Sequence, residues 1–103
     1  MSNIQLLRYN IEPGRMDDFI GWWRGLVPIR EQYGYRLLFA LADRENHQFV
    51  WAVEHDLPME EAEAVYRRAP ERDEHWLTNP DVVVSSVVNV VDPIMTAWPG
   101  SAG

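Results

Sequence analysis

The sequence predicts an α+β domain in which two helices cover one face of a four-stranded antiparallel sheet. Aliphatic and aromatic runs of strand-like character alternate with segments of helical periodicity, and proline, glycine or short polar stretches separate them. A length of 103 residues suits one domain. We therefore expect a single folded unit over residues 1–93 and a C-terminal tail over residues 94–103.

The first strand and the first helix follow each other directly. Residues 4–11 are apolar on both faces of an extended chain, and Pro13 and Gly14 end this strand. From Met16, apolar residues recur at spacings of three and four, which predicts a helix that ends near Gly34. The predicted buried stripe consists of Met16, Phe19, Ile20, Trp23, Leu26 and Val27.

The second half of the chain repeats this alternation. Strands are predicted over residues 35–43 and 48–55, joined by the polar hairpin "DREN". A second helix should run from Pro58 to about Ala69, and Pro70 should start one further helical turn through Trp76. The valine-rich stretch "DVVVSSVVNVVD" forms the last strand. The order β-α-β-β-α-β is that of a ferredoxin-like fold.

We expect the second helix to be amphipathic, with its glutamates and arginines in solvent. Glu63 and Arg67 are spaced as an exposed i,i+4 ion pair. The residues expected to be buried are Ala62, Val65, Tyr66 and Ala69.

The predicted strands are apolar on both faces, although two helices can cover only one. A second copy of the chain is the simplest cover for the open face. We therefore predict a homodimer, with two sheets facing each other.

The first helix contains the unusual segment "GWWRGLVPIR". Trp23 lies on the buried stripe, whereas Trp22 is rotated by about 100° and should sit at its margin, against the second helix or a neighbouring chain. Pro28 removes a backbone donor and should bend the helix near Gly25. We expect this helix to form the wall of a pocket.

Composition excludes several classes of function. A net charge of −7 disfavours nucleic acid and anionic membranes as partners, and the sequence shows neither a signal peptide nor a membrane span. We therefore expect a cytoplasmic protein. Cysteine and lysine are absent, which removes thiolate and side-chain Schiff-base chemistry. The sequence presents no convergent metal ligands, and we expect no metal and no bound cofactor.

Four segments carry a resemblance to a known family. They are "LLRYNIEPGRMDDF", "LVPIREQYGYRLL", "NHQFVWAVEHD" and "YRRAPER". Their order and spacing resemble the NIPSNAP-like family of the dimeric α/β-barrel superfamily. The resemblance implies a ferredoxin-like half-barrel and a face-to-face dimer. We expect the protein to be bacterial. The wider superfamily includes cofactor-independent monooxygenases, heme-degrading monooxygenases and small isomerases.

The candidate site residues are aromatic side chains and a few polar groups. We expect them to enclose a cavity between helices and sheet that holds a flat hydrophobic molecule. The predicted ligand-binding residues are Tyr9, Trp23, Arg30, Phe39, Trp51, Trp76 and Asn89. His55 and His75 are the candidates for proton transfer, because a histidine titrates near neutral pH.

Three functions stay open at this point. The first is a small-molecule-binding dimer, with catalysis that needs no cofactor as one form of it. The second is a non-catalytic dimerisation or interaction module in which the aromatic residues only fill the core. The third is a monooxygenase or isomerase acting on aromatic metabolites.

Overall fold

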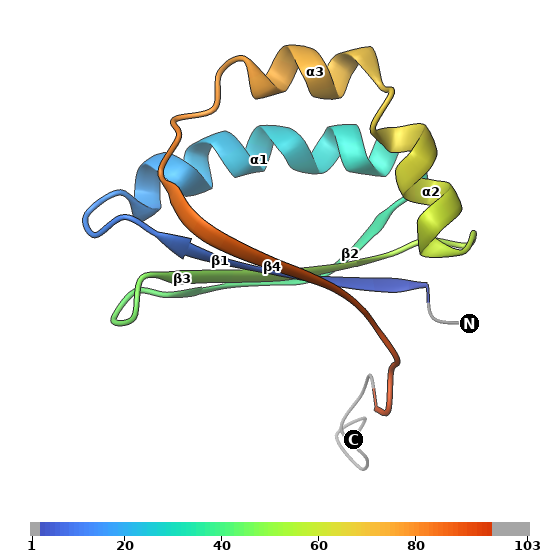
Figure 1. Ribbon diagram of the computed structural model, residues 1–103, viewed down its shortest axis with the longest axis horizontal. Helices are drawn as coiled ribbons and strands as arrows, with labels where there is room; N and C mark the ends of the chain where they lie inside the picture. Colours follow the sequence, from blue (N-terminus) through green and yellow to red (C-terminus); the bar gives the residue numbers. More distant parts are fainter. Residues whose placement is uncertain (1–2, 96–103) are drawn as a thin grey trace, which may run out of the picture.

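The computed structural model describes residues 3–95, which form a four-stranded antiparallel sheet with helices over one face (Figure 1). The strands are β1 (Ile4–Ile11), β2 (Arg36–Asp43), β3 (Gln48–Glu54) and β4 (Val83–Val91), in the spatial order β2-β3-β1-β4. The helices are α1 (Met16–Gln32), α2 (Met59–Tyr66) and α3 (Pro70–Trp76). This confirms the predicted ferredoxin-like arrangement, and the turn expected after Pro70 is a helix of seven residues.

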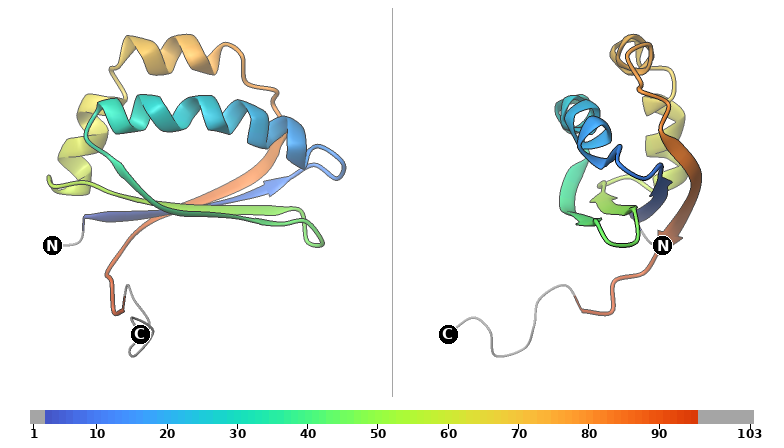
Figure 2. Two further views of the ribbon diagram at one scale, coloured as in Figure 1. Left: turned by 180° about the vertical axis from the view of Figure 1, so that it is seen from behind. Right: turned by 90° about the vertical axis from the view of Figure 1, so that its left-hand side faces the viewer.

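Helix α1 packs directly on the sheet, and α3 lies alongside it, farther from the strands (Figures 1 and 2). Helix α1 runs continuously from Met16 to Gln32 with Pro28 inside it. Its acidic first turn suits the positive end of the helix dipole. By contrast, α3 buries none of its own residues.

The core lies between α1, α2 and the inner face of the sheet. Because side chains alternate along a strand, every second residue of β1 and β3 faces the helices. Phe19 and Trp23 of α1 meet Phe49 and Trp51 of β3 there, and all four side chains are buried. Tyr66 of α2 closes the same cluster.

The outer face of the sheet carries no helix, and it is apolar. Its exposed large side chains are Leu38, Phe39, Leu41 and Val87, with exposures from 39% to 61%. The chain leaves β4 toward this side (Figure 2), where residues 92–95 and the outer face border an open pocket. Most of the predicted tail, residues 96–103, lies outside the described residues.

A β-bulge in β2 decides which side chains reach the outer face. Leu37 pairs with Val53, but the next pair is Phe39 with Ala52, so Leu38 is an extra residue. One extra residue reverses the alternation beyond it. This corrects the expected position of Phe39, which we placed between the helices and the sheet and which instead lies on the outer face.

Candidate functional site

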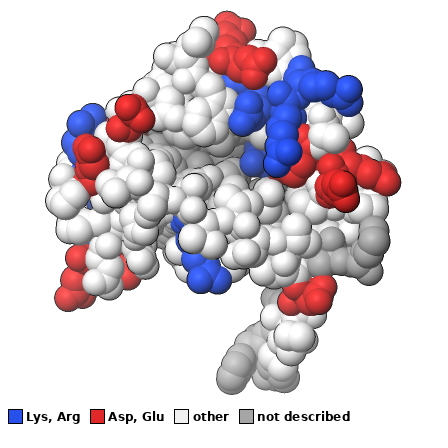
Figure 3. All heavy atoms as spheres, viewed as in Figure 1, with Lys and Arg blue, Asp and Glu red and all other residues white. Residues whose placement is uncertain are grey.

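The candidate site is a pocket of about 240 Å³ between α1, the end of α3 and strands β1 and β4. In the space-filling view the surface is hollowed between the helices and β4 (Figure 3). Helix α1 contributes Phe19, Trp22, Trp23 and Leu26 to the pocket. The opposite side consists of Tyr9, Val83 and Ser86, and Trp76, Asn79 and Asp81 complete it.

The wall of the pocket is a chain of aromatic rings in edge-to-face contact. Tyr9 lies 5.5 Å from Phe19, and Trp23 lies 5.5 Å from Trp51, measured between ring centroids. Such contacts hold rings in fixed orientations and contribute about 0.5–1.5 kcal/mol per pair beyond burial. The indole nitrogen of Trp51 donates a hydrogen bond of 3.1 Å to the Tyr9 hydroxyl. The wall is therefore rigid and preformed.

Two polar groups in this wall, the Tyr9 hydroxyl and the Trp23 indole nitrogen, do not donate a hydrogen bond to any group among residues 3–95. Burial raises the pKa of Tyr9 above its ordinary 10.0, so the phenol keeps its proton at neutral pH. Because its oxygen accepts from Trp51, the hydroxyl can still donate its own proton. The indole nitrogen of Trp23 is buried and has no hydrogen-bond partner among residues 3–95. Both groups belong to residues that line the pocket.

Helix α3 is held over the pocket by Trp22 and His75. The His75 ring stacks on Trp22 at 5.1 Å, and its Nε2 donates to the Trp22 carbonyl at 2.8 Å. In return, the Trp22 indole donates to the His75 carbonyl at 3.2 Å. Trp76 packs edge-on against Trp22. Trp22 thus sits at the margin of the stripe, as predicted, and its neighbour there is α3.

Gly25 makes this close packing possible. A Cβ atom at Gly25 would lie 2.5 Å from Cε1 of His75, which is closer than real Cβ contacts come. The glycine in "GWWRGLVPIR" therefore leaves room for a histidine ring. The bend expected near this glycine stays a prediction.

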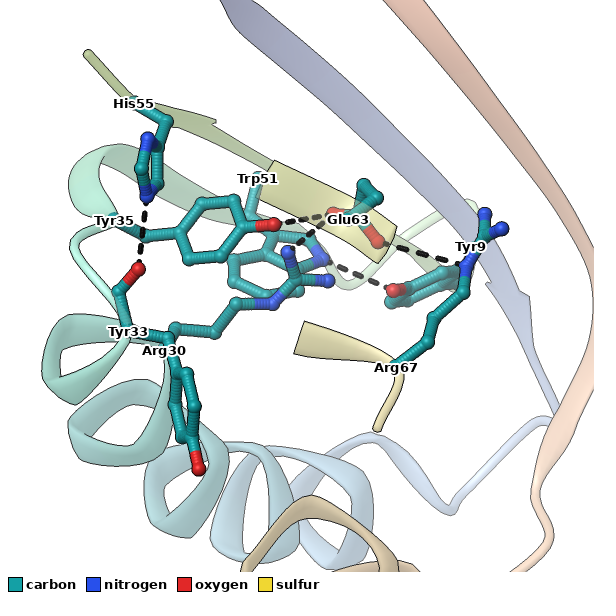
Figure 4. A network of polar contacts seen from close by, with 8 residues as sticks. All are labelled: Tyr9, Arg30, Tyr33, Tyr35, Trp51, His55, Glu63 and Arg67. Carbon is teal, nitrogen blue, oxygen red and sulfur yellow. Dashed lines mark hydrogen bonds and ion pairs between the residues drawn. The ribbon is translucent and has the colours of Figure 1, made fainter. Parts of the chain in front are cut away.

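A second polar cluster lies behind the pocket, where α1 ends against α2 (Figure 4). Arg30 and Glu63 form a buried ion pair of 2.8 Å, and the Tyr35 hydroxyl donates to the same carboxylate oxygen at 3.0 Å. The Arg30 guanidinium also lies over the rings of Tyr66 and Trp51, at 4.1 and 5.3 Å. The arginine is therefore enclosed by protein groups, although its Nε has no hydrogen-bond partner among residues 3–95.

This cluster corrects the expected surface of the second helix. Glu63 is 8% exposed, whereas Val65 is 49% exposed, so these two predicted positions were wrong. The buried side of α2 is Met59, Ala62, Glu63 and Tyr66, a regular i, i+3, i+4, i+7 stripe. Glu63 lies on this stripe because Arg30 neutralises its carboxylate there and Tyr35 donates a hydrogen bond to it.

His55 occupies the end of the sheet, away from the pocket residues. It is buried, its Nδ1 accepts from the Leu57 backbone, and its Nε2 donates to the Tyr33 carbonyl at 2.8 Å. A carbonyl can only accept, which assigns the proton to Nε2. Gly34, with a φ of +92°, makes room for the ring. His55 thus fastens the end of α1 to the end of β3.

The structure brings together only some of the predicted ligand-binding residues. Tyr9, Trp23 and Trp76 line the pocket, and Trp51 supports the first two from behind. Arg30 belongs to the buried cluster. Phe39 lies on the outer face. Asn89 pairs with Leu6 across β1 and β4, which places it on the same face, but it also borders a second pocket between α2 and β4. His75 does not line the pocket; it packs on Trp22 of α1 as part of α3.

Several pocket residues were not foreseen from the sequence. The loop after α3 brings Asn79 and Asp81 to the pocket, through a turn in which the Asn79 side chain accepts from the Asp81 backbone. Asp81 has a φ of +56°, a conformation that aspartate tolerates better than most residues. The pattern "TNPD" signals such a turn but carries no information on what it faces.

The arrangement can bind a flat apolar body and orient it with few hydrogen bonds. The Tyr9 hydroxyl offers a donor and the exposed carboxylate of Asp81 offers an acceptor, whereas the Trp23 indole nitrogen is itself buried. Among residues 3–95, no group of three His, Asp or Glu side chains is placed to hold a metal ion. In the same part of the chain, no helix is both long and apolar enough to cross a membrane.

Comparison with known proteins supports the fold. No protein-family model matches the chain, and no curated protein matches it in sequence. A NIPSNAP-like domain protein from Burkholderia xenovorans superposes with a TM-score of 0.76 at 19% identity, over 93% of this chain and 88% of that chain. A NIPSNAP family protein from Agrobacterium tumefaciens gives 0.75 at 13% identity, over 87% and 90%.

A third similar structure is not named as a NIPSNAP protein. It is a putative antibiotic biosynthesis monooxygenase from Bacteroides thetaiotaomicron, with a TM-score of 0.69 at 19% identity over 89% of each chain. The chain therefore has the fold of NIPSNAP and monooxygenase-like proteins. At these identities the likeness extends to the fold and not to the activity.

Proposed function

We propose that the pocket between α1, α3 and β4 binds a flat, largely hydrophobic small molecule. The observation that carries this proposal is a preformed concavity with rigid aromatic walls and few polar groups. We place the protein in the cytoplasm as part of this proposal.

The test uses 2-naphthol as a probe and follows quenching of tryptophan fluorescence. Ser86 lines the pocket and is exposed, so Ser86→Tyr should fill the space without disturbing the core. We expect this variant to bind 2-naphthol at least about tenfold more weakly, a loss of about 1.4 kcal/mol. Ser86→Ala keeps the pocket open and should bind as the wild type does. Equal binding by both variants would remove the pocket as the site.

Catalysis without a cofactor is the further possibility, with His55 or His75 moving a proton. The contacts of the two rings favour structural positions, because each donates Nε2–H to a backbone carbonyl of or next to α1. The question is settled by a turnover screen with aromatic substrates. If His75→Gln and His55→Gln both retain any turnover that the wild type shows, neither histidine carries the proton.

We also propose that two copies associate through the outer face of the sheet. This face exposes Leu38, Phe39 and Leu41 side by side on the β2 edge, and exposed apolar patches of this kind mark association surfaces. Arg36 and Glu54 form an ion pair of 3.0 Å at its border, as expected of a polar rim. If the protein is instead a non-catalytic dimerisation or interaction module, this association is its only function.

Light scattering at micromolar concentration tests the dimer. We expect a dimer for the wild type and a monomer for Leu41→Asp, because Leu41 is 61% exposed on the outer face. Val65→Asp places the same charge on an exposed residue of α2 and should leave the dimer intact. A wild-type monomer would refute the proposal.

A further inference from the structure

We infer that the ligand is elongated, with a neutral polar head that both donates and accepts hydrogen bonds, and that Gln5 and Arg67 bind this head. The inference rests on the proposed function, because the flat body of the same ligand occupies the aromatic pocket. A second pocket of about 350 Å³, between α2 and strands β1 and β4, holds the head.

The two pockets border the same face of β4, two residues apart along the strand. The aromatic pocket contacts β4 at Ser86, and the second pocket contacts it at Val88. These residues point to the same face and are about 7 Å apart along the strand. On β1 their partners are Tyr9 and Leu7, and Gln5 follows on the same face. A single extended molecule can therefore lie along β4 and reach both pockets.

The inner face of β4 is open along this path. Val88 and Val90 face the helices, yet they are 47% and 58% exposed. The cause is visible from the end of the sheet, where α1 lies away from β4 (Figure 2). These two valines line the second pocket and give the ligand an apolar surface on the way to Gln5.

Gln5 supplies the acceptor at the far end. It is 6% exposed, it lines the second pocket, and its Oε1 has no hydrogen-bond partner among residues 3–95. The oxygen is shielded from solvent, and a buried amide oxygen without a donor is costly, so a rotation of the Gln5 side chain that brings Oε1 to a donor in the pocket is favourable. A carboxylate cannot do this, because it has no proton to donate.

Arg67 supplies the donor. Its side chain is 70% exposed, and its contact with Glu63 is long, at 3.9 Å, while Glu63 already pairs with Arg30 at 2.8 Å. Arg67 can therefore turn to a ligand without leaving Glu63 unpaired. Arginine atoms gather at the α2 end of the hollow in Figure 3. A primary carboxamide satisfies both residues, since it donates to Gln5 and accepts from Arg67.

The experiment compares three probes by calorimetry: 2-naphthol, 6-(2-naphthyl)hexanamide and its N,N-dimethyl derivative. We expect the wild type to bind the primary amide about fivefold more tightly than the dimethylamide, which has no N–H for Gln5. Gln5→Leu should abolish this difference. Arg67→Met should weaken both amides about fivefold, because both use their carbonyl, and should leave 2-naphthol unaffected.

Arg68→Met is the matched control. Arg68 is the next residue, it is exposed, and its Nε donates to the Ala64 carbonyl of its own helix. We expect its binding of all three probes to equal that of the wild type. The inference is overturned if 2-naphthol binds but the two amides bind equally, or if Arg67→Met and Arg68→Met behave alike. Absence of 2-naphthol binding would instead refute the proposed function on which the inference rests.

Discussion

Removal of the Glu63 carboxylate should be among the most destabilising single changes in this chain. In Glu63→Ala, the Arg30 guanidinium keeps its charge in a site where its side chain is 9% exposed, and Tyr35 loses the acceptor of its hydroxyl. Breaking a buried ion pair in this way costs about 3–5 kcal/mol. Glu63→Gln keeps the shape and one acceptor, so it should cost less than Glu63→Ala.

Urea denaturation followed by tryptophan fluorescence measures this cost, because Trp51 lies next to the Arg30 guanidinium. All variants are compared at one protomer concentration, since association adds to apparent stability. Glu61→Ala removes the same side chain from the exposed side of the same helix and should change the free energy of unfolding by at most about 0.5 kcal/mol.

A double-mutant cycle then isolates the pair. Arg30→Met combined with Glu63→Met removes both charges and replaces them with apolar volume, which is often neutral for stability. The double variant should therefore be more stable than Glu63→Met alone, and comparison with both single methionine variants should give a coupling energy of about 1–3 kcal/mol. If Glu63→Ala costs no more than Glu61→Ala, the burial argument for this cluster is refuted.

Two further predictions concern helix α1 and the buried tyrosines. Gly25→Ala should lower the midpoint of thermal unfolding, because its Cβ overlaps the His75 ring. In Gly21→Ala the new Cβ meets nothing within 4 Å, so the free energy of unfolding should rise by about 0.5–1 kcal/mol from helix propensity. Equal effects of the two variants would contradict the packing of α3 on α1. Burial is the main cause that raises the pKa of Tyr35 and Tyr66 above the ordinary 10.0, so the folded state keeps these protons when the unfolded state has lost them. Their stabilising contribution is complete below pH 10 and declines as the pH rises above it. In an alkaline titration, phenolate absorbance should therefore rise together with the loss of circular dichroism. A rise in absorbance at a lower pH than the loss of circular dichroism would speak against this reasoning.

The regular elements could be predicted because their signals are local. The stripe of α1, the glycine at Gly34 and the hairpin after Asp43 each depend on neighbours a few residues away. Even Trp22 could be placed at the margin of its helix from the 100° step alone. The composition of the first helix likewise pointed to a pocket wall, and a pocket is found beside it.

Phe39 shows where such reasoning fails. Strict alternation from Tyr35 through Leu37 would place Phe39 on the inner face, but the bulge at Leu38 moves it to the outer one. A bulge depends on how two strands pair, and the pairing of β2 with β3 is not visible in β2 alone. The prediction of a pocket residue was therefore overturned by one unpaired residue.

The amino-acid sequence by itself determined the order of the elements, the faces of α1 and the apolar character of both sides of the sheet. These properties follow from periodicity, which is a short-range property of the chain. Only the tertiary structure decided that Glu63 is buried, that His75 rests on Gly25, and that the pocket closes with Asp81. Each of these contacts joins residues more than thirty positions apart. The free energy of each contact depends on a partner that only the tertiary structure supplies, because a charged or polar side chain is stable in the interior only when it is paired.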